Sequence, residues 1–287
     1  GNLRGIALST RVTIMIPEAE RDRANGLVGS ANGGAFLIGS IFSGLAIGFL
    51  GVSGMFSAAV ALTILVVVHA TTLAIPAYAG DHVEADAQQV DIRGSIAAIA
   101  AVPGLFGLIF FHTFNNFLGG VYMSLMDAYG LELVSVQTWG ILWGLLSTGF
   151  IIGGLVVARF GLGKNPLRTL LLTNVAMWTI SFIFPIQASI VLLAVGMFAY
   201  LCLIPVVEAA EQTVLQKVVE PQRQGRVFGF AQSVEQAASP ITAFVIGPLA
   251  QFVFIPFMTT GSGVPLLGPW FGTGPDRGMA LLFMAAA

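Results

Sequence analysis

The sequence predicts an all-α membrane protein, and three observations support this prediction. Of the 287 residues, 56% are hydrophobic and only 9% are charged, whereas a soluble domain has roughly 25% charged residues. Apolar runs recur between short polar breaks, and they have the length of about 20 residues that a membrane-spanning helix needs. The runs are continuous and rich in Gly and Ala, which is typical of packed membrane helices rather than of alternating barrel strands.

Turn and charge signals divide the chain into seven complete spans. Residues 1–14 are expected to be the end of an earlier helix, and residues 277–287 the first half of a final one. The chain begins without the charged segment and cleavage site of a signal peptide, so none is predicted. The expected spans, in order, are Asn25–Leu50, Met55–Tyr78, Pro103–Tyr129, Thr138–Arg159, Leu167–Pro185, Ala188–Gln216 and Val227–Met258.

Basic residues occur in alternate breaks, and this alternation orients the helices. Lys and Arg collect in the short cytoplasmic loops of membrane proteins. The breaks near Gly51, Leu131 and Gln187 contain neither residue, so these breaks are expected on the outer side. The breaks expected in the cytoplasm contain Arg11, Arg21, Arg23, Arg93, Arg159, Lys164, Arg168, Lys217, Arg223 and Arg226.

The polar stretch 79–94 interrupts the apolar pattern for longer than any other cytoplasmic break. It is therefore predicted to be a linker between two helical bundles. Ile92–Ala101 is expected to form a short interfacial helix before Pro103 begins the next span. The predicted domains are residues 1–80, the C-terminal part of the first bundle, 81–98, the cytoplasmic linker, and 99–287, the second bundle.

Small residues recur along the first complete span at characteristic intervals. The matching glycines are Gly26, Gly39 and Gly44, while Ala35, Ser40 and Ser43 occupy the other positions. In this spacing the span resembles the antiporter signature of the major facilitator superfamily. Small residues let two helices touch closely, either as ordinary packing or as a seal against leak.

Three further stretches carry the same resemblance. The stretch 154–165, GLVVARFGLGKN, is similar to a basic cytoplasmic loop of the superfamily, with Ala158 in place of its aspartate; a tight basic turn is the alternative. Residues 16–27 and 216–229 are similar to two equivalent cytoplasmic turns of drug and siderophore exporters. On this register the chain extends from the end of helix four to the start of helix twelve. The resemblance implies two six-helix bundles, a central cavity and alternating access.

Ionisable residues deep in a membrane are costly, so each is a functional candidate. Glu208 and Glu211 lie three residues apart and share one helix face. Glu208 and Glu235 are each expected roughly 12 Å from the cytoplasmic edge, at 1.5 Å per residue. Because desolvation disfavours a charged carboxylate, both can bind and release a proton, and they are the proton-coupling candidates. A structural role stays open for Glu235.

The expected role of Glu211 is structural. It is predicted to pair with Arg159 or Arg226 in a charge network at the cytoplasmic gate. Further polar residues at helical spacing are expected either to face a substrate cavity or to form interhelical hydrogen bonds worth about 1 kcal/mol each. These cavity candidates are His112, Asn115, Asn116, Gln232 and Gln236.

Several classes of function are excluded by what the sequence lacks. GLGKNP is not a complete phosphate-binding loop, and His69, His82 and His112 are too scattered for a metal site. Without these motifs, no enzyme activity, catalytic residue or cofactor is predicted. The net charge of −2 gives no basic footprint, so no nucleic-acid partner is predicted either. The resemblance implies a monomeric carrier in the cytoplasmic membrane of a bacterium, exporting small amphipathic or hydrophobic compounds in exchange for protons. The alternatives are an uptake carrier of the same superfamily and a non-transporting sensor or scaffold.

Overall fold

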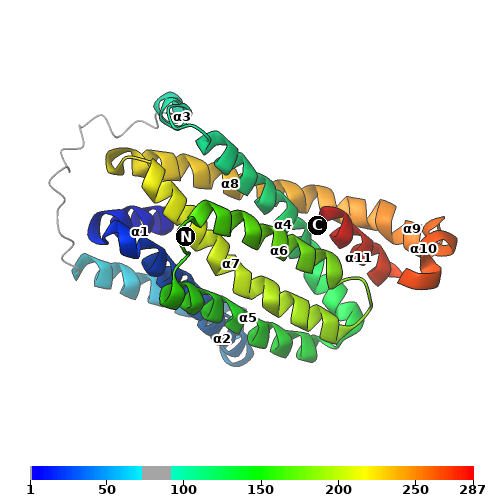
Figure 1. Cartoon of the computed structure of the whole chain (residues 1–287). Helices are drawn as coiled ribbons and strands as arrows, with labels where there is room; N and C mark the ends of the chain where they lie inside the picture. Colours follow the sequence, from blue (N-terminus) through cyan, green and yellow to red (C-terminus); the bar gives the residue numbers. More distant parts are fainter. Residues whose placement is uncertain (1, 73–91) are drawn as a thin grey trace.

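The computed structural model describes residues 2–72 and 92–287, and these residues form an elongated helical bundle (Figure 1). Within these two ranges no residue is in a β-strand. The predicted all-α class is therefore confirmed. The helices are α1 (Asn2–Met15), η1 (Glu18–Glu20), α2 (Arg21–Thr72), α3 (Ile92–Ala100), α4 (Leu105–Leu133), α5 (Val136–Phe160), α6 (Pro166–Ile183), α7 (Ile190–Val218), α8 (Pro221–Leu249), the π-helical η3 (Ala250–Phe254), α9 (Ile255–Thr259), α10 (Gly263–Phe271) and α11 (Pro275–Ala286).

The predicted spans coincide with helices wherever the structure describes them. The first two spans are the two halves of α2, although the end of the second, after Thr72, lies outside the described residues. The predicted short helix before the third span is α3, and it meets α4 at an angle of 110°. One difference is α10, which lies within a stretch expected to be an irregular break. Its apolar run of 9 residues is too short to register as a span.

Membrane-spanning capacity follows from length and apolar composition. Four helical segments among the described residues have both, and α3 with α4 makes a fifth if the bent pair is one span. The bundle is thus consistent with a multi-pass membrane protein. The four segments are Ser53–Thr72, Thr138–Phe160, Ile190–Val218 and Arg223–Thr259.

Side-chain caps fix where three of the helices begin. Ser135, Asn165 and Ser189 each accept a hydrogen bond from the backbone N–H three residues later, at 3.4, 3.1 and 3.4 Å. Such caps satisfy backbone donors that have no partner inside the helix. Pro166 follows one cap at the first helical position, where its missing N–H costs nothing. The starts of α5, α6 and α7 are therefore encoded locally.

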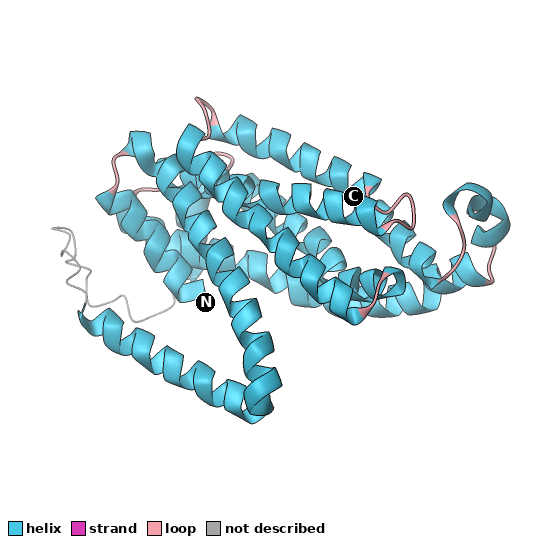
Figure 2. Cartoon of the chain, turned by 90° about the horizontal axis from the view of Figure 1, so that it is seen from below, coloured by secondary structure: helices cyan, strands magenta, loops and turns pink. Residues whose placement is uncertain are grey.

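A sharp bend divides α2 at Gly51. The backbone there has φ 68° and ψ 177°, which only glycine adopts without strain. Figure 2 shows that the second half of α2 turns sharply from the first half and lies apart from the remaining helices. Its apolar side chains, such as Phe56 and Ile64, are exposed at 63% and 59%. This exposure suits a helix whose surroundings are lipid rather than water.

The breaks rich in Lys and Arg meet at one end of the bundle, here called the basic end. Asp22, at the start of α2, accepts a hydrogen bond from the N–H of Leu162 in the α5–α6 turn, at 2.9 Å. Lys217, at the end of α7, lies 3.8 Å from Glu18 of η1. These contacts place three of the predicted cytoplasmic breaks together, as the alternation of charge indicates.

Close packing joins α2 to α5. A Cβ atom at Gly26 would lie only 2.7 Å from the backbone N of Ala158, so the two helices touch there without room for a side chain. Gly33, which the signature does not include, is packed equally tightly against Phe150. By contrast, no described atom lies within 4 Å of a Cβ at Gly39. The packing of Gly44 lies outside what the structure describes.

Candidate functional site

A cavity of about 640 Å³ lies inside the bundle, between α1, α2 and α4–α8. Its volume is within the range of roughly 300–1,000 Å³ that is typical of small-molecule sites. The cavity brings together side chains from helices that are far apart in the sequence. The residues predicted for proton coupling and for a substrate cavity, together with Glu211, all line it: Glu208, Glu211, Glu235, His112, Asn115, Asn116, Gln232 and Gln236.

An acidic cluster, formed by Glu208 and Glu211 of α7, Glu235 of α8 and His112 of α4, lies on one part of the wall. Glu211 Oε2 is 3.0 Å from His112 Nδ1, and the carboxyl groups of Glu211 and Glu235 interact directly. Glu211 and Glu235 are each 8% exposed, and His112 is 5% exposed. Helical spacing explains why Glu208 and Glu211 share a face, but it does not predict which groups face them from α4 and α8.

Three buried polar atoms in this cluster and beside it have no hydrogen-bond partner among the described residues. They are His112 Nε2, Gln212 Oε1 and Glu235 Oε1. Buried polar atoms in folded proteins almost always have a partner, and all three residues line the cavity. The arrangement therefore fits a site that a proton, a water molecule or a ligand completes.

An aromatic cluster forms another part of the wall and is centred on Tyr122 of α4. The rings of Trp178, Phe184 and Tyr200 have their centroids 6.0, 6.0 and 6.4 Å from that of Tyr122. All four residues line the cavity. The Tyr122 hydroxyl donates a hydrogen bond of 2.8 Å to the carbonyl of Phe283 on α11, which fixes the ring. The cavity thus combines a carboxylate-bearing region with an aromatic one.

Comparison with known proteins identifies the family of this chain. The sequence model of the Major Facilitator Superfamily matches residues 6–243, a range that includes all or most of each helix lining the cavity. The chain belongs to the major facilitator superfamily. No curated protein and no solved structure matches it. The resemblance inferred from the motifs is thereby confirmed at the level of the superfamily, and the chain is a multi-pass membrane transporter with an all-α fold.

The gate network expected for Glu211 is not the one that this major facilitator protein forms. Its partner is His112, whose Nδ1 lies 3.0 Å from Glu211 Oε2, whereas Arg159 and Arg226 are exposed and do not line the cavity. The reason is distance along the helices. Arg226 precedes Glu235 by nine residues on α8, which is about 13 Å along the axis. A buried carboxyl in contact with Glu235 is therefore reached by His112 from α4 instead.

Asn115 has hydrogen bonds on both sides of its amide. Its Nδ2 donates to the carbonyl of Phe111 at 2.8 Å, and its Oδ1 accepts from Trp178 Nε1 at 2.7 Å. Asn115 therefore links α4 to α6 and also lines the cavity. Its position orients the indole of the aromatic cluster.

A polar network that the sequence did not indicate lies at the basic end of the cavity. Asn25 of α2 is buried and its Nδ2 lies 3.0 Å from both Thr213 Oγ1 and Gln216 Oε1 of α7. Gln216 Nε2 in turn donates to the carbonyl of Ser9 on α1 at 3.0 Å. Asn25 and Ser9 line the cavity. This set, called the floor network, joins α1, α2 and α7, and no local pattern could have paired residues 188 or more positions apart.

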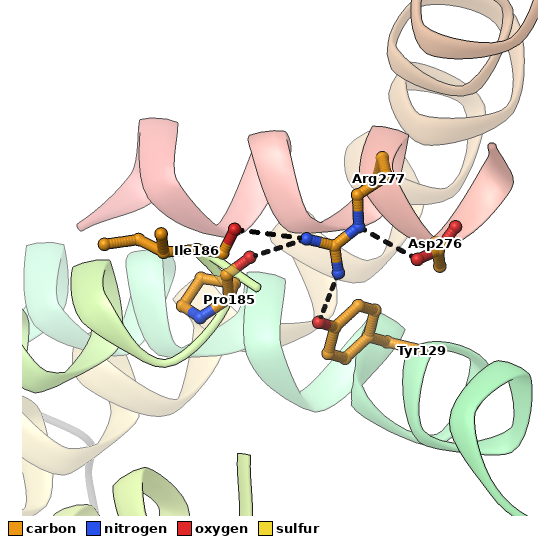
Figure 3. Close-up of polar contacts among 5 residues, drawn as sticks. All are labelled: Tyr129, Pro185, Ile186, Asp276 and Arg277. Atoms are coloured by element: carbon orange, nitrogen blue, oxygen red, sulfur yellow. Dashed lines mark hydrogen bonds and ion pairs between the residues drawn. The ribbon is translucent and has the colours of Figure 1, made fainter. Parts of the chain in front are cut away.

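The opposite end of the transporter is held by a buried arginine, Arg277 of α11, which is 2% exposed (Figure 3). Its guanidinium donates to the Tyr129 hydroxyl at 2.7 Å and to the Pro185 carbonyl at 3.1 Å, and it pairs with Asp276 at 2.9 Å. These bonds tie α11 to α4 and to the turn between α6 and α7. Sequence analysis placed Arg277 at the start of a final helix without indicating this role.

Proposed function

We propose that this transporter exports small amphipathic or hydrophobic compounds in exchange for protons, by alternating access. The observation that carries the proposal is the buried contact of Glu211, Glu235 and His112 in the cavity wall. It places groups that can exchange protons beside a cavity of suitable size for a small molecule. The proposed location is the cytoplasmic membrane of a bacterium, with the basic end in the cytoplasm and the protein acting as a monomer.

The proposed proton exchange rests on the electrostatics of two buried carboxyl groups in contact. Like charges repel strongly where water is excluded, so two adjacent carboxylates are accommodated best when they share a proton. Glu211 and Glu235 come from different helices, so a relative movement of α7 and α8 changes their separation and their access to water. His112, 3.0 Å from Glu211, offers a neighbouring imidazole through which a proton can leave. Glu208 supplies a further carboxyl on the same wall.

The export direction is supported by the two turns that resemble those of drug and siderophore exporters. Asn25 belongs to the first of these turns and Gln216 to the second. The structure brings the two into a direct hydrogen bond of 3.0 Å. The resemblance thus concerns residues that join the helices at the proposed cytoplasmic end of the cavity, where an exporter must open to load its cargo.

The test is efflux driven by an imposed pH gradient, measured in vesicles that contain the full-length protein and a panel of amphipathic dyes and siderophores. Glu235→Gln is expected to abolish gradient-dependent efflux while retaining binding of the same compounds. Glu132→Gln, which changes an exposed acid outside the cavity, is the matched control and should transport normally.

Either of two results would refute the proposal. Gradient-dependent movement in the inward direction, still dependent on Glu235, would make the protein an uptake carrier. If no compound moves in either direction while the protein is folded in the vesicles, the export hypothesis is refuted and a role as a sensor or scaffold is favoured.

A further inference from the structure

We propose that the cavity selects elongated organic cations, with the positive group at the acidic cluster and an aromatic or apolar body at the aromatic cluster. The inference rests on the proposed function in taking this cavity as the transport site, and it adds the chemical class of the compound. The proposal stands on the charge of the wall, on its unpartnered atoms and on the separation of the two clusters.

The charge of the wall is one-sided. Among the described residues that line the cavity there are three glutamates and neither Lys nor Arg. A positive ligand complements such a wall, whereas an anion would lie near carboxyl groups without a compensating cation. The nearby arginines do not change this, since Arg159 and Arg226 lie outside the lining.

Two unpartnered acceptor atoms in the cavity wall also favour a positively charged ligand. Glu235 is 92% buried, and its Oε1 has no hydrogen-bond partner within the described part of the chain. Gln212 is half-buried, and its buried Oε1 likewise has no partner there. Both atoms are acceptors, so a ligand that donates hydrogen bonds or carries a positive charge satisfies them, and an acceptor does not. The site therefore requires a positively charged or donating group at this part of the wall.

An inorganic ion is a poorer occupant than an organic one. No group of three His, Cys, Asp or Glu side chains in the described ranges is arranged to hold a metal ion. The cavity of about 640 Å³ is also far larger than a single ion needs, and its other wall consists of rings. Apolar and aromatic surface of this kind binds the body of an organic compound.

The spacing of the clusters sets the length of the compound. Tyr200 and Glu208 lie on α7 eight residues apart, which is about 12 Å along the helix. On α4, His112 and Tyr122 are ten residues apart, or about 15 Å. Both helices thus place the rings at a similar distance from the carboxyl groups. A cation with its ring at this distance from its charge contacts both clusters at once.

The test is equilibrium binding to the full-length protein in lipid nanodiscs, without any gradient. The probe is a naphthyl-alkyl-trimethylammonium series with spacers shorter than, equal to and longer than the cluster separation. Each member is compared with its uncharged tert-butyl isostere and with the sulfonate of the same body. The ammonium is expected to bind at least about tenfold more tightly than the isostere. Affinity should be highest at the spacer that spans about 12 Å.

Two pairs of variants locate the two ends of the ligand. Glu235→Gln should weaken binding of the ammonium compound about tenfold and binding of the tert-butyl isostere much less. Retained binding of the isostere therefore also shows that the variant is folded. Glu132→Gln, an exposed acid elsewhere, should alter neither. Tyr200→Leu should lower the affinity for every member of the series, and Tyr200→Phe, which keeps the ring, should lower it less.

Equal affinity for the ammonium and the isostere, or tighter binding of the sulfonate, overturns the proposed substrate class even if every variant fails to fold. This outcome leaves proton-driven export of other compounds intact. Conversely, selective binding of the cation by a protein that moves nothing in vesicles contradicts the proposed function but not the selectivity of the cavity. The two failures are therefore distinguishable.

Discussion

The contact between α2 and α5 predicts opposite outcomes for the same substitution at two glycines of one helix. At Gly26 an added Cβ meets the backbone N of Ala158 at 2.7 Å and the Val157 Cβ at 2.8 Å. Backbone atoms cannot move aside as a flexible side chain can, so Gly26→Ala must push the helices apart. Overpacking of this kind costs about 1–3 kcal/mol. At Gly39 the added methyl meets no described atom within 4 Å.

The magnitude follows from adding helix propensity to the packing term. Alanine is favoured over glycine in a helix interior by about 1 kcal/mol. Gly39→Ala should therefore raise the free energy of unfolding by up to about 1 kcal/mol, whereas Gly26→Ala should lower it by up to about 2 kcal/mol. The free energy of unfolding, measured by reversible unfolding in mixed micelles, gives both values. Equal effects, or a larger loss at Gly39, would refute the packing of α2 against α5 through Gly26.

The same pair of variants separates the two roles that remained open for these small residues. If the interface only packs the helices, Gly26→Ala lowers stability without changing the passive proton permeability of vesicles. If the interface seals the bundle, the leak rises in Gly26→Ala and stays unchanged in Gly39→Ala. A pH-sensitive dye trapped inside the vesicles measures the leak directly.

Three further substitutions test the site and its two ends. Arg277→Gln leaves the buried Pro185 carbonyl and Asp276 without their charged partner, and should lower the free energy of unfolding by about 3–5 kcal/mol in the micelle assay. Asn25→Ala should cost about 1–3 kcal/mol, because Gln216 keeps its bond to Ser9 but loses Asn25; an unchanged unfolding midpoint would contradict the floor network. His112→Gln can still donate to Glu211 and should unfold almost as the wild type does, whereas His112→Phe should lose about 1–3 kcal/mol; equal midpoints would contradict the 3.0 Å pair.

Much of the fold could be predicted because its main signal is local. An apolar run between polar breaks marks a membrane helix without any knowledge of its neighbours, so the spans coincide with α2 and with the helices from α4 to α9. The alternating basic breaks likewise placed Asp22, Leu162 and Lys217 at one end. Short elements were harder, as α10 shows, because its apolar run is far below membrane length.

The candidate site was predictable in its members but not in its pairings. Glu208, Glu211 and Glu235 could be identified as functional candidates from sequence alone, because a carboxyl group deep in a membrane is energetically costly and therefore rare. Which group faces a carboxyl depends on how the helices pack. Glu211 of α7 contacts His112 of α4 rather than one of the arginines at the basic end of the bundle. Gly26 and Gly39 make the same point, because one residue type in one signature is tightly packed at one position and open at the other.

The bonds between helices at the two ends of the bundle differ in kind, and this difference bears on where the proposed bundles would separate. On the proposed division, α2 belongs to the first bundle and α7 to the second, so the floor network of Asn25 with Thr213 and Gln216 crosses between them. Its bonds join neutral groups and contribute about 1 kcal/mol each, which thermal motion and ligand binding can offset. Arg277 joins α11, α4 and the α6–α7 turn, all within residues 99–287, through buried charge-assisted bonds. If one bundle rocks against the other, as proposed, the movement should break the floor network and leave the arginine cluster intact.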